Sequence, residues 1–448
     1  MPRRSASGSE VLADLAEQLE TVTPRIIGVL IDQAGTCLLD ALACACGGRD
    51  LPWARQARAI AGGGDDAAIW ATGGRRSGLA DAVFANSVAC HALLHEDTHA
   101  ESRVHPGTVV VPAALAVGER LRAPLSEVLR AIVLGYEAIA QVSAAVLTDE
   151  FGARGWRASS VFGPFGAAAA AAHVLGLDRV TAVHALGLAA SSAAGLCQWA
   201  QDGTTEVFFQ NAGAARAGVV AALLAREGAT GAASAVDGVF GLRQAFGGAR
   251  DESGPPEVRL DRMAISATFF KAHPSCALTQ EPIDAAISLA AQGVEPEQVV
   301  EATVHTSGVA AGYPGCDNAT VLDAPISRQM SLQFAVAAAL TDGGLRPHRY
   351  SGALDPGIVN LAARISVVVD PVADKAFPAR RDARVTARLA DGRVVSADSR
   401  EQVQLSAADV IGKFRSYAGP VLGARAEAVL RAVRLPGTDS ARFAALFH

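Results

Sequence analysis

Long basic runs are missing from this chain of 448 residues. The 39 Lys and Arg residues are outnumbered by 45 Asp and Glu residues, for a net charge of −6. No patch of basic residues interleaved with aromatic residues occurs either, although proteins that bind nucleic acids usually carry one. We therefore expect no nucleic-acid partner.

Long apolar runs are also missing. The longest, Val161 to Ala172, is rich in small residues and is interrupted by Gly163 and Pro164. Crossing a bilayer takes about 20 apolar residues. The segment after Arg3-Arg4 is charged and amphipathic, whereas a secretion signal has an apolar stretch there. We expect a protein that neither enters a membrane nor is secreted.

The cysteines show no framework of disulfides or metal ligands. There are seven, an odd number, and they are scattered. Cys44 and Cys46 are too close together for a zinc knuckle. Buried thiols in a reducing compartment are the simplest interpretation, which predicts a cytoplasmic protein.

Apolar residues, by contrast, are abundant. They make up 50% of the chain, and the mean hydropathy is +0.25. A soluble protein of this composition can bury its surplus apolar surface between subunits. We expect a homodimer built through the helical part of the chain, with the alanine-rich helices that begin near Ala167 and Ala214 at the interface.

The length and the apolar spacing predict two domains. Apolar residues recur every three or four positions from residue 10 to about 260 and again over 407–447, which predicts helices. Strand patterns appear only between these regions, at 299–306, 363–370, 383–389 and 394–396, with helical patterns at 283–291 and 332–340. Asp391-Gly392 joins the last two strands and suits a type I′ hairpin turn.

These patterns predict a mainly α fold. A large all-helical domain would comprise residues 1–268 and 401–448, and a smaller α+β lid would be inserted at 269–400.

One segment, residues 91–107, permits two different chemistries. His95-Glu96-Asp97-Thr98-His99 fits the zinc motif H-E-x-x-H, and His105 has the spacing of a third ligand. However, Ser102 replaces the glycine of the longer motif, and the methionines that follow are far downstream. A zinc hydrolase is therefore an outside hypothesis. His91, His95 and His99 would share one helical face and are expected to support the core rather than bind metal.

The second interpretation comes from ordered blocks that extend over some 300 residues. They are Ala85-Asn86, His91, Glu96 to His99, His105 to Val109, Val111 to Ala113, Ala131 to Glu137, Gly163 to Gly166, Ala185 to Ala189, Ala212 to Ala215, Lys271 to Pro274 and Ser331 to Phe334. Together they resemble the signature of the MmgE/PrpD family, which includes 2-methylcitrate dehydratase, cis-aconitate decarboxylase and iminodisuccinate epimerase.

This resemblance implies a lyase or isomerase that moves a proton next to a carboxyl group of a small carboxylic acid, with no cofactor and no metal. By position, Asp97, Thr98, His105 and Lys271 match catalytic residues of the family. His105 is the first choice as acid and base. Lys271 would hold a substrate carboxylate. The family also implies the same helical domain and lid.

Several family positions are replaced here. Leu94 replaces an aspartate of the family pattern, and Phe208 replaces a lysine. Histidines are replaced by Arg157, by Asn211 and, relative to the decarboxylase, by Cys276. Without the replaced charged side chains, a citrate-like tricarboxylate would lose hydrogen-bond partners for its carboxylates, which disfavours such a substrate. Arg157 adds a side chain that can hold a carboxylate but cannot act as a base. We expect a less charged acid with an apolar portion.

The expected substrate-binding residues are Arg157, Ser160, Phe208, His273, Cys276 and Tyr313. Cys276 could act as a nucleophile or proton donor, or could simply be buried. A competing hypothesis is that this divergent pocket has lost the lyase reaction. It would then only bind a metabolite, or catalyse a cyclisation or isomerisation in a specialised pathway.

Overall fold

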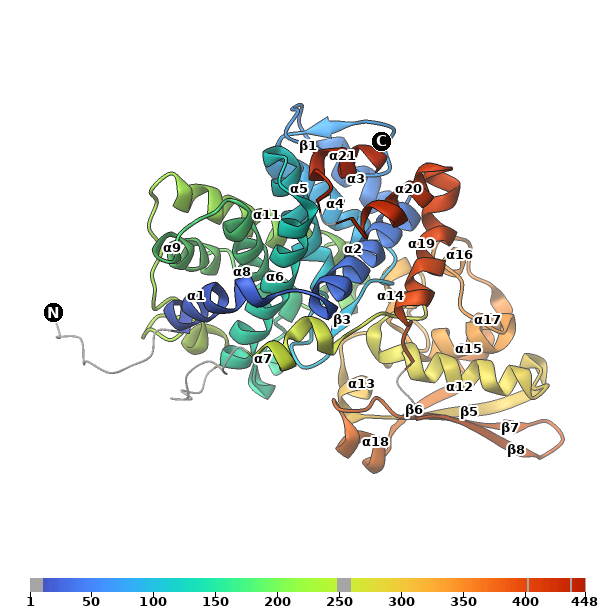
Figure 1. Ribbon diagram of the computed structural model, residues 1–448. Coiled ribbons are helices and arrows are strands. Elements are labelled where there is room, and N and C mark those ends of the chain that lie inside the picture. Colours follow the sequence, from blue (N-terminus) through green and yellow to red (C-terminus); the bar gives the residue numbers. More distant parts are fainter. Residues whose placement is uncertain (1–10, 248–258, 401–402, 436, 448) are drawn as a thin grey trace.

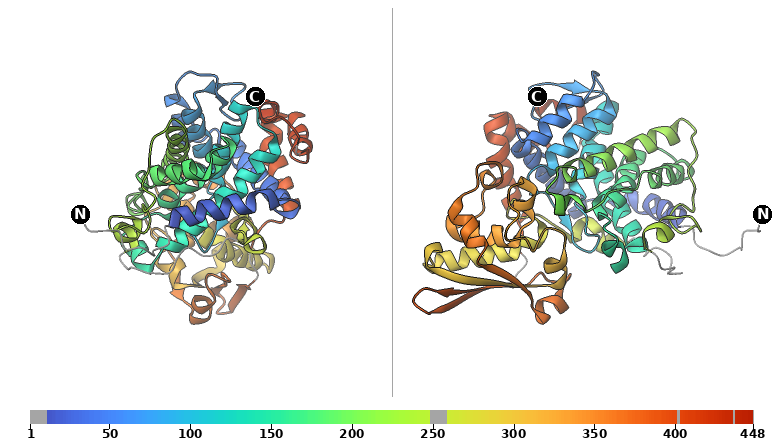
Figure 2. Two further views of the ribbon diagram at one scale, coloured as in Figure 1. Left: turned by 60° about the vertical axis from the view of Figure 1, so that its left-hand side comes forward. Right: turned by 180° about the vertical axis from the view of Figure 1, so that it is seen from behind.

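The structure is a computed structural model that describes residues 11–247, 259–400, 403–435 and 437–447 (Figure 1). Helices make up most of it, and a smaller part carries a four-stranded sheet. Figure 2 shows this sheet at one end of the molecule. The expected mainly α fold is confirmed, while the exact domain boundaries stay a prediction.

The helical part has a core of long helices. They are α1 (Val11–Val22), α2 (Val29–Gly48), α4 (Leu79–His91), α5 (Gly107–Leu121), α6 (Leu125–Val146), α8 (Ala158–Val174), α9 (Arg179–Ala190) and α11 (Val207–Arg226). Shorter helices are α3 (Pro52–Ile60), α7 (Asp149–Ala153) and α10 (Trp199–Asp202). The chain returns through α19 (Ala407–Leu422), α20 (Arg425–Ala432) and α21 (Ser440–Ala444), whose apolar side chains join the same core.

Small side chains let α8 and α11 approach each other closely. A Cβ atom on Gly218 of α11 would lie 2.6 Å from the Cβ atom of Ala167 in α8, so only glycine fits there. The alanines from Ala167 to Ala172 are all buried inside the chain. Packing within the chain already covers this alanine run, so a subunit interface there would use other residues of these helices. The homodimer itself stays a prediction.

The smaller part contains a sheet with the strand order β6-β5-β7-β8. Its strands are β5 (Val299–Thr306), β6 (Ile365–Val369), β7 (Ala383–Leu389) and β8 (Val394–Ser399). Strands β5 and β6 are parallel, and the other pairs are antiparallel. The helices of this part are α12 (Gln280–Ala291), α13 (Gly308–Gly312), α14 (Pro325–Met330), α15 (Leu332–Asp342), α16 (His348–Ser351), α17 (Pro356–Ala362) and α18 (Pro371–Ala376).

The sheet buries one face and exposes the other. Val385, Ala387 and Leu389 of β7 lie in a core with side chains of α12 and α15. The alternate residues Arg384 and Arg388 form exposed ion pairs on the other face. The predicted hairpin between β7 and β8 exists, but its turn is not type I′. Gly392 has a positive φ of 85° and its neighbour Asp391 does not, whereas type I′ needs both.

Three helices, α2, α6 and α11, are long and apolar enough to cross a membrane by length and composition alone. In this structure 72%, 78% and 56% of their most apolar windows, respectively, are buried inside the protein. The absence of a membrane partner stays a prediction.

A short two-stranded ladder joins the two parts of the fold. Strand β3 (Thr98–His99) follows α4 and pairs antiparallel with β4 (Thr268–Phe269), so that Thr98 lies opposite Phe269. Between α4 and β3 the backbone turns at Leu94, whose φ of 51° is left-handed. For a residue with a Cβ atom this conformation costs about 1–2 kcal/mol, so the surrounding contacts must maintain it. This ladder brings residues 94–105 next to the segment that follows Phe269.

Candidate active site

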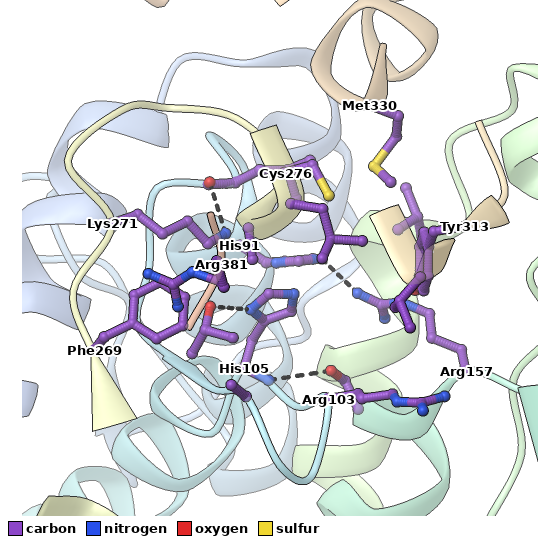
Figure 3. Close-up of a pocket in the computed structure, with 18 of the residues that line it drawn as sticks. His91, Arg103, His105, Arg157, Phe269, Lys271, Cys276, Tyr313, Met330 and Arg381 are labelled. Carbon is purple, nitrogen blue, oxygen red and sulfur yellow. Dashed lines mark hydrogen bonds between the residues drawn. The ribbon is translucent and has the colours of Figure 1, made fainter. Parts of the chain in front are cut away.

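A cavity of about 800 Å³, including its open mouth, lies at this junction (Figure 3). Both parts of the fold supply its walls. Its polar lining residues are His91, Thr98, Arg103, His105, Arg157, Ser159, Lys271, Cys276, Tyr313 and Arg381. Its larger apolar ones are Leu94, Trp199, Val207, Phe269, Leu278, Val309, Met330 and Phe377. The cavity therefore offers cations, imidazoles and an apolar wall.

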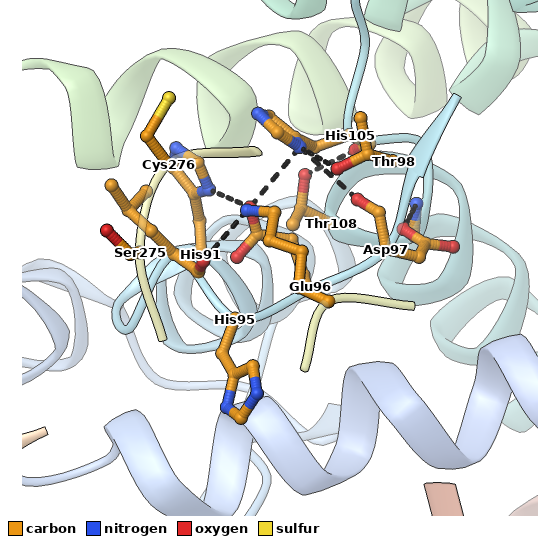
Figure 4. Close-up of polar contacts among 12 residues, drawn as sticks. His91, His95, Glu96, Asp97, Thr98, His105, Thr108, Ser275 and Cys276 are labelled. Carbon is orange, nitrogen blue, oxygen red and sulfur yellow. Dashed lines mark hydrogen bonds and ion pairs between the residues drawn. The ribbon is translucent and has the colours of Figure 1, made fainter. Parts of the chain in front are cut away.

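The Glu96 carboxylate lies beneath this cavity and holds its basic side chains together (Figure 4). Its Oε1 atom is 3.0 Å from Lys271 Nζ, 3.2 Å from His91 Nδ1 and 3.4 Å from His105 Nδ1. Burial by itself would raise the pKa of Glu96, but Lys271 and the two histidines outweigh it and hold that pKa well below 4.5. Glu96 is therefore ionised.

Lys271 is fixed by two of its three N–H groups. They donate to the Leu94 carbonyl oxygen at 2.8 Å and to Glu96 at 3.0 Å. The strained turn at Leu94 aims that carbonyl at the lysine. An ammonium group has three donors, so one remains for a ligand in the cavity that Lys271 lines.

His91 connects Glu96 to Arg157. Arg157 Nη2 lies 2.8 Å from His91 Nε2. Because arginine can only donate, Nε2 accepts, and the proton is on Nδ1, which donates to Glu96. Burial lowers the pKa of His91, which agrees with this neutral form.

His105 is held by its Nδ1 atom in the same way. That atom lies 3.0 Å from Thr98 Oγ1 and 3.2 Å from the Asp97 carbonyl oxygen, in addition to its contact with Glu96. A carbonyl and a carboxylate only accept, so Nδ1 carries the proton and Nε2 keeps its lone pair. Burial and the Lys271 cation hold the pKa of His105 well below 6.5. His105 is therefore a neutral imidazole, its side chain 19% exposed, at the cavity wall.

Asp97 faces away from the cavity. Its Oδ1 atom accepts from the Gly107 N–H at 2.9 Å, and its Oδ2 atom accepts from the Tyr136 hydroxyl at 2.5 Å. Burial and the nearby Asp40 carboxylate raise its pKa to about 7. Asp97 thus anchors the first turn of α5 next to His105 and is a positioning residue.

Arg157 is a buried guanidinium without a carboxylate partner within 4 Å in the described part of the chain. Its Nη1 atom instead donates to the amide oxygen of Asn211 at 2.5 Å, and more weakly to Ser160 at 3.4 Å. Asn211 donates in turn to Thr108. Neutral partners orient Arg157 and leave its charge available for an anion.

The structure brings together six of the predicted site residues: Thr98, His105, Arg157, Lys271, Cys276 and Tyr313 all line the cavity. At Cys276, a hydrogen bond from the Cys316 thiol lowers the pKa. Asp97 and three further predictions do not line the cavity.

Those three are Ser160, Phe208 and His273. The Ser160 hydroxyl contacts Arg157 and the side-chain oxygen of Gln210, each at 3.4 Å. Phe208 is fully buried and stacks on Trp53, with ring centroids 3.9 Å apart, behind His91. The His273 backbone N–H donates to Gln280, and its ring lies outside the cavity lining. The structure thus places these three side chains outside the cavity lining, and their part in substrate binding stays a prediction.

The helical premise of the zinc hypothesis is also wrong. Helix α4 ends at His91, so the later histidines do not share its face. His95 points away from the cavity (Figure 4) and contacts the Tyr417 hydroxyl, whereas His99 contacts Ser102. Within the described ranges, no three His, Cys, Asp or Glu side chains are grouped as metal ligands.

Sequence reasoning missed the central role of Glu96 and did not identify Arg103 and Arg381. Glu96 could have been found, because it occupies a family acidic position. Arg381 lies beside Arg380 in a segment without a motif, and no local signal distinguishes the two.

Comparisons with known proteins identify the family of this chain. The MmgE/PrpD N-terminal domain matches residues 11–253, and the MmgE/PrpD C-terminal domain matches residues 273–435. The chain belongs to the MmgE/PrpD family. The resemblance of the sequence blocks is thereby confirmed.

Several curated relatives carry related names. The cis-aconitate decarboxylase-like protein oryM of Aspergillus oryzae is 30% identical over 247 residues, which is 53% of this chain and 51% of that protein. A cis-aconitate decarboxylase of Aspergillus terreus is 26% identical over 436 residues, covering 89% and 87%. The cis-aconitate decarboxylase of Mus musculus is 25% identical over 362 residues, covering 76% and 72%. The match thus spans about half the length of the first of these relatives.

The positions at which this MmgE/PrpD chain departs from the family pattern fall into two groups. Leu94, Arg157 and Cys276 line the cavity and change what it contacts. Phe208 and Asn211 lie behind it, where they support His91 and Arg157. The second group changes how the site is held rather than what touches a ligand.

Proposed function

We propose that this protein is a cofactor-independent lyase or isomerase that transfers a proton at the carbon next to a carboxylate of a small organic acid. One observation carries the proposal. The Nδ1 atom of His105 is held by acceptors, so its unprotonated Nε2 atom is the base at the wall of a cationic cavity.

The charges of the site favour an anion. Lys271 and Arg157 are both buried, and the Glu96 carboxylate pairs with Lys271, whereas the partners of Arg157 are neutral. Buried charge is costly unless it is paired. A substrate carboxylate would supply the missing charge, and it would accept from Arg157 and from the remaining N–H of Lys271. Leu94 and Met330 favour an acid with an apolar portion.

The proton transfer follows from these contacts. His105 Nε2 takes the proton from the α carbon, and the electron pair of the C–H bond moves into the adjacent carboxylate. Arg157 and Lys271 stabilise the negative charge that develops there, while Glu96 stabilises the imidazolium. That electron pair then forms a C=C bond while a leaving group on the β carbon departs with the pair of its own bond, as in a dehydratase, or the proton returns to the α carbon, as in an epimerase.

Decarboxylation uses the same groups in a different order. The carbon–carboxylate bond breaks, CO₂ leaves with the bond's electron pair remaining on the carbon, and His105, after taking up a proton from solvent, delivers it to the carbanion. The names of the relatives support this form of the reaction, whereas the neutral state of His105 supports proton removal first.

Proton exchange tests the proposal directly. The protein is incubated in D₂O with cis-aconitate, 2-methylcitrate or iminodisuccinate, and NMR follows both turnover and deuterium incorporation next to the carboxyl groups. We expect His105→Gln to lower the rate by about 10²–10⁴, the usual contribution of a general base. His348→Gln, an exposed histidine on α16, is the matched control.

Two outcomes would count against this function. An undiminished exchange rate in His105→Gln would refute the role of His105. Binding of these acids without turnover or exchange by the unmodified protein would instead support the metabolite-binding hypothesis.

A further inference from the structure

Lys413 of α19 is a buried cation that lies outside the cavity lining. Its Nζ atom donates to Asp40 Oδ1 of α2 at 2.7 Å. Burial alone would lower the pKa of Lys413, but Asp40 outweighs it and raises that pKa, so Lys413 is charged. A buried ion pair is often no more stabilising than apolar side chains of similar size. Stability by itself therefore does not account for this pair.

A second hydrogen bond of Lys413 gives it a different role. Nζ also donates to the His95 carbonyl oxygen, at 2.5 Å. The Tyr417 hydroxyl, which lies four residues further along α19 and so on the same face, contacts Nδ1 of the His95 ring at 3.0 Å. Helix α19 thus holds His95 both at its main chain and at its side chain.

His95 belongs to a turn whose carbonyl oxygens are held by two buried lysines. The preceding residue, Leu94, has a left-handed φ of 51°, and its carbonyl oxygen accepts from Lys271 at 2.8 Å. The next carbonyl oxygen, that of His95, accepts from Lys413. A left-handed conformation at a residue with a Cβ atom persists only where surrounding contacts maintain it. The two lysines supply contacts of that kind from two distant segments of the chain.

The residues directly after this turn supply the groups that fix His105. Thr98 Oγ1, the Asp97 carbonyl oxygen and Glu96 Oε1 lie 3.0, 3.2 and 3.4 Å from His105 Nδ1. The partners of an imidazole decide which of its two nitrogens carries the proton. A change in the path of the turn would move all three groups together. The proton of His105 would then be free to shift to Nε2, and the base would be lost.

We infer that Lys413, anchored by Asp40, is a positioning residue that sets the tautomer of His105 through the main chain of residues 94–98. The inference rests on the proposed function, because it concerns the base proposed there. Lys413 touches no ligand in this role. Its loss should therefore lower turnover rather than weaken substrate binding.

Replacing the ion pair as a whole separates positioning from stability. Lys413→Met alone leaves the Asp40 carboxylate buried without compensation, which destabilises the fold. In the double variant, Lys413→Met with Asp40→Leu, apolar side chains of similar size fill the same space. We expect its midpoint of unfolding in urea to stay near that of the unmodified protein. The hydrogen bond to the His95 carbonyl oxygen is nevertheless absent from it.

Nitrogen NMR of the full-length protein with ¹⁵N-labelled histidine reports the tautomer without any substrate. The His105 signals are assigned by their loss in His105→Gln. We expect the Nδ1–H form in the unmodified protein and a mixture of both tautomers in the double variant. In the D₂O assay the double variant should exchange about 10²-fold more slowly, as for a slightly displaced catalytic group, with KM changed less than about threefold.

The matched control is Arg415→Gln combined with Glu427→Gln. This pair joins α19 to α20 at 2.7 Å, and both side chains are at least half exposed. Removing it takes one charge of each sign from the same region without touching the turn. The control should keep the tautomer of His105 and the exchange rate of the unmodified protein.

The outcomes separate this inference from the proposed function. A double variant that keeps the Nδ1–H form and the full exchange rate overturns the inference and leaves the proposed function standing. Loss of folding in the double variant also counts against it, because the pair would then be needed for stability. If the unmodified protein has the Nδ1–H form but exchanges no proton, the proposed function fails and the NMR comparison alone decides the inference. A changed tautomer with slow exchange in the double variant, and neither in the control, supports it.

Discussion

Replacing Glu96 by glutamine removes the negative charge on which the site depends. Glu96 Oε1 is 3.0 Å from Lys271 Nζ, and both side chains are fully buried. At an effective dielectric constant of about 20, unit charges this close attract by about 5 kcal/mol. Breaking one side of a buried pair costs about 3–5 kcal/mol. We expect the free energy of unfolding of Glu96→Gln, measured with urea, to fall by that amount.

Activity should fall for a related reason. During proton transfer His105 becomes an imidazolium 3.4 Å from Glu96. With the same dielectric constant this contact stabilises the charge by about 5 kcal/mol, and losing it would lower the exchange rate by about 10³–10⁴-fold. Glutamine has nearly the size of glutamate and its side-chain oxygen can accept the same hydrogen bonds, so the fall in exchange rate measures the effect of the lost charge. Glu101→Gln, an exposed glutamate in the following loop, is the matched control and should alter stability by less than about 0.5 kcal/mol.

The pH dependence checks the same reasoning. Because the pKa of Glu96 is held well below 4.5, its contribution to stability is fully present above pH 4.5 and is lost as the pH falls through its lower folded-state pKa. The difference between the two proteins should therefore stay constant at neutral pH and shrink only in strong acid. A Glu96→Gln protein with undiminished stability and exchange activity would refute the role assigned to this carboxylate.

Two further substitutions test the support around His105. Asp97 has a pKa raised from 3.8 to about 7, so the folded state binds the extra proton and stability falls as the pH rises from about 4 to 7. In urea titrations Asp97→Asn should flatten that decline, gaining at most about 4 kcal/mol relative to the unmodified protein across the window, and an unchanged slope would contradict it. In Gly107→Ala the new Cβ atom would lie 2.6 Å from Asp97 Oδ1, which should cost about 1–3 kcal/mol and lower activity. Its control, Gly412→Ala, enters open space on α19 and should stabilise by up to about 1 kcal/mol; equal effects of both would exclude the steric explanation.

The regular elements and part of the site follow from local patterns of residues. Apolar spacing identified α12, α15 and the strands β5, β6 and β7, because each pattern reflects which side of its own element is buried. The motif blocks correctly brought Thr98, His105 and Lys271 to one cavity, although Lys271 is far from the others in the chain.

Only the tertiary structure decided the direction and the partners of individual side chains. Glu96 and Asp97 are neighbours, yet one faces Lys271 and the other faces Tyr136. The H-E-x-x-H motif suggests a helix, but α4 ends before this motif begins, and the last two residues of the motif form strand β3, which pairs with β4. Arg381 donates a hydrogen bond to Glu281, which lies 100 residues earlier in the chain. The burial and ionisation of these side chains depend on contacts between segments that are distant in the chain. The local spacing of residues does not predict those contacts.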